Sequence, residues 1–235
     1  MDMEKLNEII GLQKRWYRIR SANLYDTLDA MGYGNQCLDL RIKPIVPGSR
    51  IAGCAVTMRG KRAPYTKEEL TENPLLNQDF GIVQNYAYPG SVIVVDSGGE
   101  PMSGKFGEMT SWALKQHGAR GIVVDGFIRD YEGLLEIPDY TVCSRGTSPI
   151  ESNHRWTLDD FNCVIGMPGS LTTSLRVCPG DWIVGDTDGI IVVPAEIAME
   201  ALIKAEDIEN REEGMRQDIS AGVTFSEAFK NWGRA

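Results

Sequence analysis

Histidine and paired cysteine are scarce in this chain. Two histidines occur in 235 residues, and the five cysteines form no CxxC pair. His117 precedes Gly118 at an expected helix end, and His154 lies in a polar loop, so both are interpreted as structural. The cysteine pattern predicts neither a disulfide framework nor a structural zinc site.

Positive charge and long apolar runs are also limited. Lys and Arg number 24 against 33 Asp and Glu, which gives a net charge of -9, and the basic residues form no cluster in the sequence. A nucleic-acid ligand is therefore not expected. The charged N-terminus lacks the apolar core of a signal peptide, and no apolar run reaches membrane-spanning length. We expect a soluble, cytoplasmic protein with no membrane partner.

The hydrophobic content of 42% is enough for a full core, and we expect a single α/β domain over 1–235. Helical spacing predicts two helices within 1–33, the second with Ser21 as its N-cap, and a helical extension over 195–235. A further helix is expected over 103–117, and 65–81 is interpreted as an irregular insertion. Short apolar runs predict strands at 91–96, 121–126, 140–144, 162–166, 181–185 and 189–194.

One strand–loop–helix–strand unit concentrates the chemistry. A helix from Glu108 climbs roughly 14 Å, and the following strand returns by about 17–20 Å. Glu108 should therefore meet Arg129 and Asp130, which follow the strand. Two carboxylates without histidine or cysteine suit Mg²⁺ or Mn²⁺. Arg129 offers a planar fork for a substrate carboxylate, and the amides of Met109 and Thr110 after Gly107 could bind its oxygens.

Other interpretations of this unit remain open. Arg129 and Asp130 could form a surface ion pair, which is what an isolated Arg-Asp dipeptide usually does. The run VVDSGG with Asp125 suggests a dinucleotide or S-adenosylmethionine fold, but SGGEPMSG lacks the GxGxxG spacing. The acids Asp181, Asp186 and Asp188 could suggest a second metal site, although turns explain them more simply.

At these residues the sequence resembles the RraA-like family, which includes 4-hydroxy-4-methyl-2-oxoglutarate/4-carboxy-4-hydroxy-2-oxoadipate aldolases and the regulator of ribonuclease activity A. The enzymes carry an acidic residue, twenty residues and then Arg-Asp, as Glu108 and Arg129-Asp130 do here. Further similar segments are LYDTLDAMG, RIAGCAVTM, PGSVIVVDSGG, SRGTSP and CPGDWIVGDTDGIIVVP. The resemblance implies a swivelling β/β/α domain assembled as homotrimers or homohexamers.

The resemblance also assigns roles to residues. Asp130 would bind Mg²⁺ or Mn²⁺ directly, Glu108 would position water at the metal, and Arg129 would hold the substrate carboxylate and enolate oxygen. Gly107, Met109 and Thr110 would present amides to the pyruvyl carboxylate. A glutamate from a neighbouring subunit's C-terminal helix completes the family's site, and by register we place it at Glu212, with Glu213 as the alternative. Many members have Asp where this chain has Glu108.

The implied activity is that of a metal-dependent, class II pyruvate aldolase. It would cleave a 4-hydroxy-2-oxo acid to pyruvate and a second carbonyl compound, with oxaloacetate decarboxylation as a side activity. A Schiff-base mechanism is disfavoured, because Lys105 is the sole lysine expected near the site. Arg145 is a further candidate for orienting substrate. The alternatives are a non-catalytic RraA-like regulator, whose branch does not keep the Arg-Asp pair, and an S-adenosylmethionine-dependent methyltransferase.

Overall fold

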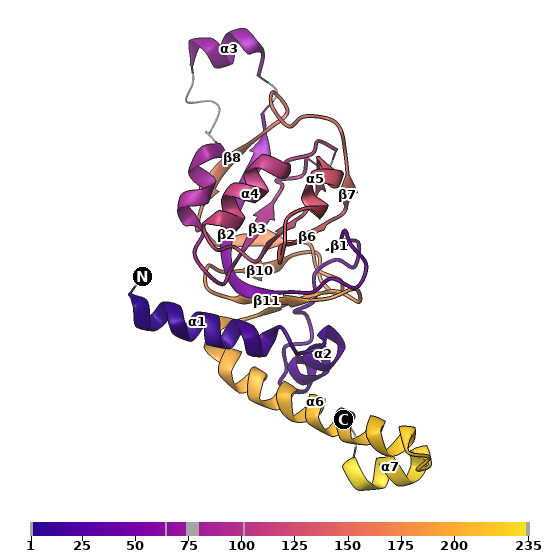
Figure 1. The fold of residues 1–235 in the computed structure, drawn as a ribbon. Coiled ribbons are helices and arrows are strands. Elements are labelled where there is room, and N and C mark those ends of the chain that lie inside the picture. Colours follow the sequence, from indigo (N-terminus) through magenta and orange to yellow (C-terminus); the bar gives the residue numbers. More distant parts are fainter. Residues whose placement is uncertain (1, 64, 74–79, 101, 234–235) are drawn as a thin grey trace.

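A mixed β-sheet organises the protein (Figure 1). The computed structural model describes residues 2–63, 65–73, 80–100 and 102–233. Within these residues the main sheet has eight strands, in the order β1-β6-β4-β3-β2-β11-β12, with β8 also paired to β2. They are β1 (Lys43–Pro44), β2 (Ile51–Arg62), β3 (Ser91–Asp96), β4 (Gly121–Val124), β6 (Thr141–Ser144), β8 (Trp156–Phe161), β11 (Trp182–Gly185) and β12 (Ile190–Val193).

Strands β2, β3, β4 and β6 run parallel, whereas β1, β8, β11 and β12 pair antiparallel with their neighbours. The long strand β2 joins the two halves of the sheet, since it pairs with β3 on one side and with β11 and β8 on the other. Two small ladders complete the strands: β5 (Phe127–Ile128) with β7 (Gly146–Thr147), and β9 (Ile165–Met167) with β10 (Leu175–Val177).

Helices form two groups at different parts of the sheet (Figure 1). One group, α4 and α5, lies against the parallel strands, and the other, α1, α2 and α6, runs along the base of the molecule. The helices are α1 (Met3–Trp16), α2 (Ser21–Ala30), α3 (Lys67–Glu72), η2 (Phe80–Tyr86), α4 (Glu108–Gln116), α5 (Tyr131–Leu135), η3 (Ala195–Ile197), α6 (Ala198–Ser220) and α7 (Phe225–Trp232).

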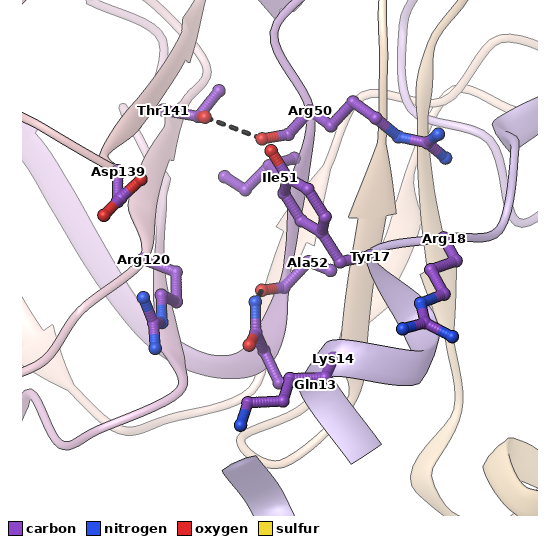
Figure 2. Close-up of a pocket in the computed structure, with 10 residues that line it drawn as sticks. All are labelled: Gln13, Lys14, Tyr17, Arg18, Arg50, Ile51, Ala52, Arg120, Asp139 and Thr141. Carbon is purple, nitrogen blue, oxygen red and sulfur yellow. Dashed lines mark hydrogen bonds between the residues drawn. The ribbon is translucent and has the colours of Figure 1, made fainter. Parts of the chain in front are cut away.

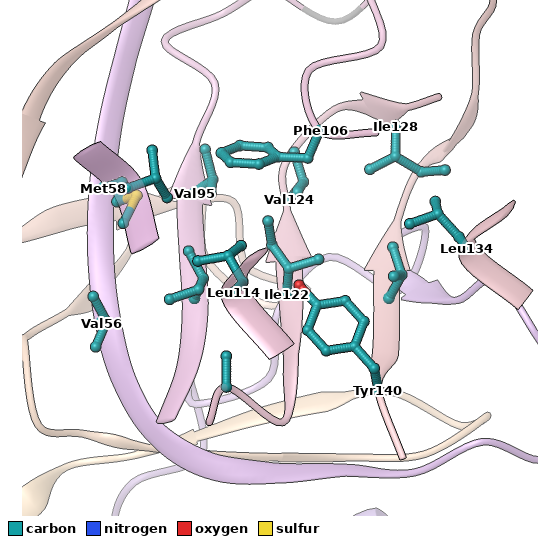
Figure 3. Packing of buried hydrophobic residues seen from close by; sticks show 14 of the residues in the cluster. Val56, Met58, Val95, Phe106, Leu114, Ile122, Val124, Ile128, Leu134 and Tyr140 are labelled. Carbon is teal, nitrogen blue, oxygen red and sulfur yellow. The ribbon is translucent and has the colours of Figure 1, made fainter. Parts of the chain in front are cut away.

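The alternating direction of side chains along each strand explains how one sheet contributes to several hydrophobic clusters. In β3, Ile93 and Val95 pack towards α4 and α5, while Val92 and Val94 point into the opposite cluster. Successive side chains of a strand point to opposite faces, so a strand that is apolar throughout must be covered on both. Figure 3 shows the first of these clusters, in which Phe106, Leu114 and Tyr140 cover the sheet. Full burial of each such side chain stabilises the fold by about 1.5–3 kcal/mol.

The helices at the base cover a third cluster. Trp182 and Val184 of β11 pack there against α1, α2 and α6, with Trp16 and Trp182 ring centroids 6.0 Å apart. The expected helices of 1–33 and the long helix of 195–235 are thus found, and they cover one surface of the sheet together. The expectation of a single domain over 1–235 stays a prediction.

Several boundaries differ from those expected. The helix expected over 103–117 begins at Glu108, because the preceding residues are extended. The strand expected over 162–166 begins at Ile165, after Asn162 adopts a left-handed conformation with φ 50°. The region 65–81 includes helix α3, whose N-cap Thr66 and Glu69 form a reciprocal capping box; residues 74–79 of it lie outside the described residues.

The N-cap expected at Ser21 is wrong. Helix α2 begins at Ser21 itself, and the side chain of its N-cap residue, Arg20, forms no capping hydrogen bond. Asp186, which lies in a distant turn, caps the helix instead. Its carboxylate accepts hydrogen bonds from the Ser21 N–H at 2.9 Å and from the Ser21 hydroxyl at 2.5 Å. Asp181 similarly accepts the N–H of Cys178 at 2.7 Å. These acids therefore serve turns and helix starts, as the simpler interpretation of the sequence predicts.

Candidate active site at the carboxyl ends of two parallel strands

Strands β3 and β4 deliver two loops to the same edge of the sheet. Val95 pairs with Val124 in a parallel register, so Asp96 and Asp125 leave the sheet side by side. Burial, reinforced by the neighbouring Asp125, raises the pKa of Asp96 above its ordinary value. Asp125 instead accepts a hydrogen bond from Nε of Arg145 at 2.5 Å. Because both chain segments continue from this edge, the loops that follow are held close together.

The two loops then run alongside one another. The N–H of Lys105 donates to the Phe127 carbonyl at 2.9 Å, and the N–H of Arg129 donates to the Phe106 carbonyl at 3.1 Å. This ladder is the reason that residues 104–106 are extended rather than helical. It also places the start of α4 beside Asp130, so the structure brings Glu108, Arg129 and Asp130 together.

Asp130 occupies the centre of this group. Its Oδ2 accepts the N–H of Glu108 at 3.4 Å, and its Oδ1 accepts Nε of Arg129 at 3.2 Å. The backbone of Asp130 is left-handed, with φ 60° and ψ 44°, a conformation that Asp tolerates better than most residues. The side chains of Arg129 and Asp130 are 34% and 43% exposed, so their ion pair contributes little to stability.

Two glycines leave the space that these carboxylates occupy. A Cβ at Gly107 would lie 2.2 Å from Asp130 Oδ2, and one at Gly133 would lie 2.3 Å from Glu108 Oε2. Asp130 therefore sits against the start of α4, and Glu108 sits over α5. Carboxylates in such open positions are the hard oxygen donors that Mg²⁺ and Mn²⁺ prefer, and these cations usually keep several waters. The residues present fit such a cation, with Asp130 and Glu108 as the donors.

The described residues contain no cluster of three or more His, Cys, Asp or Glu side chains that could hold a metal ion. A cation here would therefore depend on few protein ligands. Met109 and Thr110 lie in the first turn of α4, where backbone N–H groups have no acceptor within the helix. These amides and the helix dipole favour an anion at the same edge.

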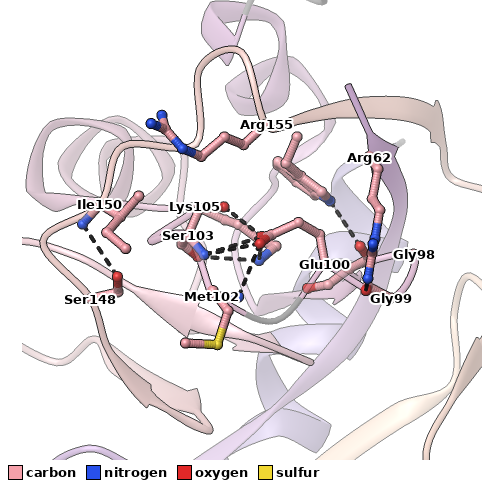
Figure 4. A network of polar contacts seen from close by, with 12 residues as sticks. Arg62, Gly98, Gly99, Glu100, Met102, Ser103, Lys105, Ser148, Ile150 and Arg155 are labelled. Carbon is pink, nitrogen blue, oxygen red and sulfur yellow. Dashed lines mark hydrogen bonds and ion pairs between the residues drawn. The ribbon is translucent and has the colours of Figure 1, made fainter. Parts of the chain in front are cut away.

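The loop before α4 also holds a buried ion pair, between Lys105 and Glu100 (Figure 4). The fully buried side chain of Lys105 contacts Glu100 at 2.9 Å, and the Ser103 hydroxyl donates to the same carboxylate at 2.6 Å. Burial opposes ionisation of Glu100, but the hydrogen bonds from Ser103 and Lys105 hold its pKa at about 2. Burial lowers the pKa of Lys105, although Glu100 opposes this. Glu100 was not predicted from the sequence, where it is an isolated acidic residue five positions before Lys105.

The other candidates lie elsewhere. Arg145 binds Asp125 and, at 3.2 Å, Asp39, so its guanidinium already holds two carboxylates. Glu212 lies on α6 and accepts hydrogen bonds from Asn23 at 3.0 Å and Arg20 at 3.2 Å. Helix α6 runs along the base of the molecule, away from α4 and α5 (Figure 1). The structure thus does not bring Glu212 to Asp130 within one chain.

Comparison with known proteins agrees with this architecture. The family model described as RraA-like, Aldolase/RraA, matches residues 21–192. The fold and the site together define the class of this protein. It is an α/β protein with acidic and basic groups at one edge of its sheet. The chain belongs to the RraA-like family, and the fold expected from the sequence is confirmed.

Individual relatives carry different names. Protein DlpA of Legionella pneumophila is 26% identical over 94% of this chain and 34% of its own length. A Halalkalibacterium halodurans protein named "Putative 4-hydroxy-4-methyl-2-oxoglutarate aldolase" is 32% identical over 61% of this chain and 65% of its own length. The chain thus spans less than two thirds of the length of each of these relatives.

Two solved structures share the fold over most of the chain. An uncharacterized protein from Pseudomonas syringae has a TM-score of 0.78 and 25% identity, with 94% of each chain covered. RraAS2 of Streptomyces coelicolor, described as an unusual member of the RNase ES inhibitor RraA family, has a TM-score of 0.73 and 27% identity, covering 88% of this chain and 97% of its own. Among the described residues, no helix is both long and apolar enough to cross a membrane.

Proposed function

We propose that this protein is a divalent-metal-dependent pyruvate aldolase. It would cleave a 4-hydroxy-2-oxo acid to pyruvate and a second carbonyl compound, and decarboxylate oxaloacetate as a side activity. The observation that carries the proposal is the convergence of Glu108, Arg129 and Asp130 at the start of α4. The aldolase name borne by several relatives supports the same reaction class.

The residues have distinct roles in this proposal. Asp130 and Glu108 would hold Mg²⁺ or Mn²⁺, which when bound supplies Lewis-acid polarisation of the substrate's keto group. Arg129 would release Asp130 and pair with the substrate carboxylate, and its charge would offset the negative charge that develops on the keto oxygen. The amides of Met109 and Thr110 would hold the remaining carboxylate oxygen.

The bond changes follow from the substrate. A water molecule positioned by Glu108, with Glu212 of a second subunit assisting, would take the proton from the C4 hydroxyl of the aldol. The C3–C4 bond then breaks, and its electron pair passes into the pyruvate enolate, which is protonated at C3. Oxaloacetate reaches the same enolate by losing CO₂, which explains the side activity. A small 2-oxo acid is thus the proposed substrate, and the proposed homo-oligomer, a trimer or hexamer, would complete the site.

The first test is pyruvate release from oxaloacetate and from 4-carboxy-4-hydroxy-2-oxoadipate, with Mg²⁺, with Mn²⁺ and with chelator. We expect metal-dependent release that Asp130→Asn lowers by about 10²–10³-fold. The control Asp160→Asn, at an exposed ion pair with Arg59, should retain it. Absence of release from both substrates by folded protein with metal present would count against an aldolase. Absence of metal binding as well would favour a regulator that binds a protein partner, the class to which the RraAS2 description points.

The role of Glu212 has its own test. Asp130→Asn and Glu212→Gln variants are each purified and then mixed under conditions that let subunits exchange. If Glu212 acts on a neighbouring subunit's Asp130, the mixture contains some sites with both native residues, and activity returns. No recovery despite demonstrated subunit exchange would exclude the shared site.

A further inference from the structure

The amino ends of the parallel strands, opposite the candidate active site, border a cavity. A cavity of about 430 Å³ opens between α1 and the amino ends of β2, β4 and β6 (Figure 2). Its volume is in the range of cavities that hold small organic ligands. Arg120 enters it immediately before β4, whereas Asp125 follows the same strand. The four residues of β4 span about 13 Å, which separates this cavity from the candidate active site.

The charge of the cavity contrasts with that of the chain. Lys14 of α1 and Arg18, which follows that helix, line the cavity together with Arg50 and Arg120, which directly precede β2 and β4. Asp139 is the sole carboxylate in the described lining. The whole chain has a net charge of -9, so this gathering of cations is a local feature. Neighbouring charge also acts on Lys115: burial, followed by repulsion from Arg120, lowers its pKa.

The cations differ in how they are held. Arg50 donates to the carbonyl of Ile19 and lies over the ring of Tyr17, 6.0 Å from its centroid, so it is fixed in the wall. Within the described part of the chain, Lys14, Arg18 and Arg120 form no ion pair with a carboxylate. Nε of Arg120 is buried and has no hydrogen-bond partner there.

A buried donor without an acceptor is costly, because it has lost its water without replacing it. The lining also has an apolar part, formed by the Tyr17 ring with Ile51 and Ala52. We propose that this cavity binds a small organic anion with at least two negative charges, either a phosphate ester or a di- or tricarboxylate. One anionic group would accept from Arg120, the other would face Lys14 and Arg18, and the apolar wall would contact the body of the ligand.

The test uses the full chain with inorganic phosphate, citrate and a hexaglutamate peptide as probes, measured by titration calorimetry and by the Nε–H resonance of Arg120. We expect saturable binding of phosphate or citrate, with a shift of that resonance and a rise in Tm. Lys14→Gln/Arg120→Gln should weaken binding about tenfold or more. The control Lys43→Gln/Arg176→Gln removes the same charge from exposed strand positions and should change binding less than about twofold.

The outcomes separate the alternatives. Preference for phosphate or for citrate identifies the anionic group of the ligand. Lys14→Gln alone, on the exposed side of α1, should still weaken binding if the double variant does not fold. Three results would overturn the proposal. They are an equal weakening of anion binding in the control double variant, no saturable binding of phosphate or citrate, and tighter binding of the peptide than of either small anion. Because this cavity lies apart from Asp130, the outcome of the binding experiment does not depend on aldolase activity.

Discussion

The ion pairs Lys105–Glu100 and Arg129–Asp130 lie on neighbouring segments but in different environments. In the first, the two side chains are 0% and 13% exposed; in the second they are 34% and 43% exposed. The buried pair has fixed partners and no access to a ligand. The exposed pair can exchange its internal contact for a substrate carboxylate or a cation at little cost. The comparison indicates that the deeper pair supports the loop and the outer one is available for chemistry.

The largest effect on stability should come from Lys105→Met. This change leaves the charge of Glu100 buried without its partner, and we expect it to lower the free energy of unfolding by about 3–5 kcal/mol. The matched control is Lys61→Met, because Lys61 pairs with Asp159 at 2.7 Å but is 52% exposed. There we expect a loss of about 0–1 kcal/mol. Urea unfolding measures the stability of both variants. Equal losses of stability would contradict the difference between the buried and the exposed ion pair.

Asp130→Asn should affect activity rather than stability. Asn tolerates the left-handed backbone of this position and removes only the charge. We expect pyruvate release to fall by about 10²–10³-fold, with a change in Tm of less than about 2 °C. Steady-state kinetics and thermal unfolding provide the two readouts. A large loss of Tm would instead make Asp130 a structural residue like Glu100.

Gly133→Ala tests whether the position of Glu108 matters. The new Cβ would meet the end of the Glu108 side chain and displace it. We expect activity to fall about tenfold, or 1.4 kcal/mol in transition-state stabilisation, while the protein stays folded. Glu108→Asp in the same chain shortens the side chain and should recover part of the loss. The control Gly11→Ala, where a Cβ meets nothing within 4 Å, should leave activity unchanged.

A further effect concerns the dependence of stability on pH. The folded pKa of Glu100, about 2, is below its ordinary value of 4.5, so ionised Glu100 stabilises the folded state above about pH 4.5. This contribution is lost as pH falls from 4.5 towards 2. The stability advantage of the native protein over Glu100→Gln should therefore shrink across this window in urea unfolding. An advantage that is constant between pH 6 and 3 would contradict the pairing.

Local patterns were sufficient for much of the fold. The apolar runs at 91–96 and 121–126 predicted β3 and β4, and helical spacing predicted α1, α2 and the helix after Pro194. Strand β8 (Trp156–Phe161) was not predicted, because the charged residues Asp159 and Asp160 interrupt its apolar pattern. Those residues are accommodated by Arg59 of β2, a partner about a hundred positions away. Sequence periodicity does not identify such a partner.

For the candidate site, the sequence was enough to predict which residues meet, because the spacing from Glu108 to Arg129 fixes the lengths of the helix and the strand between them. The prediction of hard oxygen donors also came from the sequence, since histidine and paired cysteine are scarce. The burial of Lys105 against Glu100 and the position of Glu212 away from Asp130 became evident from the packing of the chain. The same applies to Arg120, which joins Lys14 and Arg18 in one cavity. Burial and long-range contacts depend on how distant segments pack, and no local pattern records that.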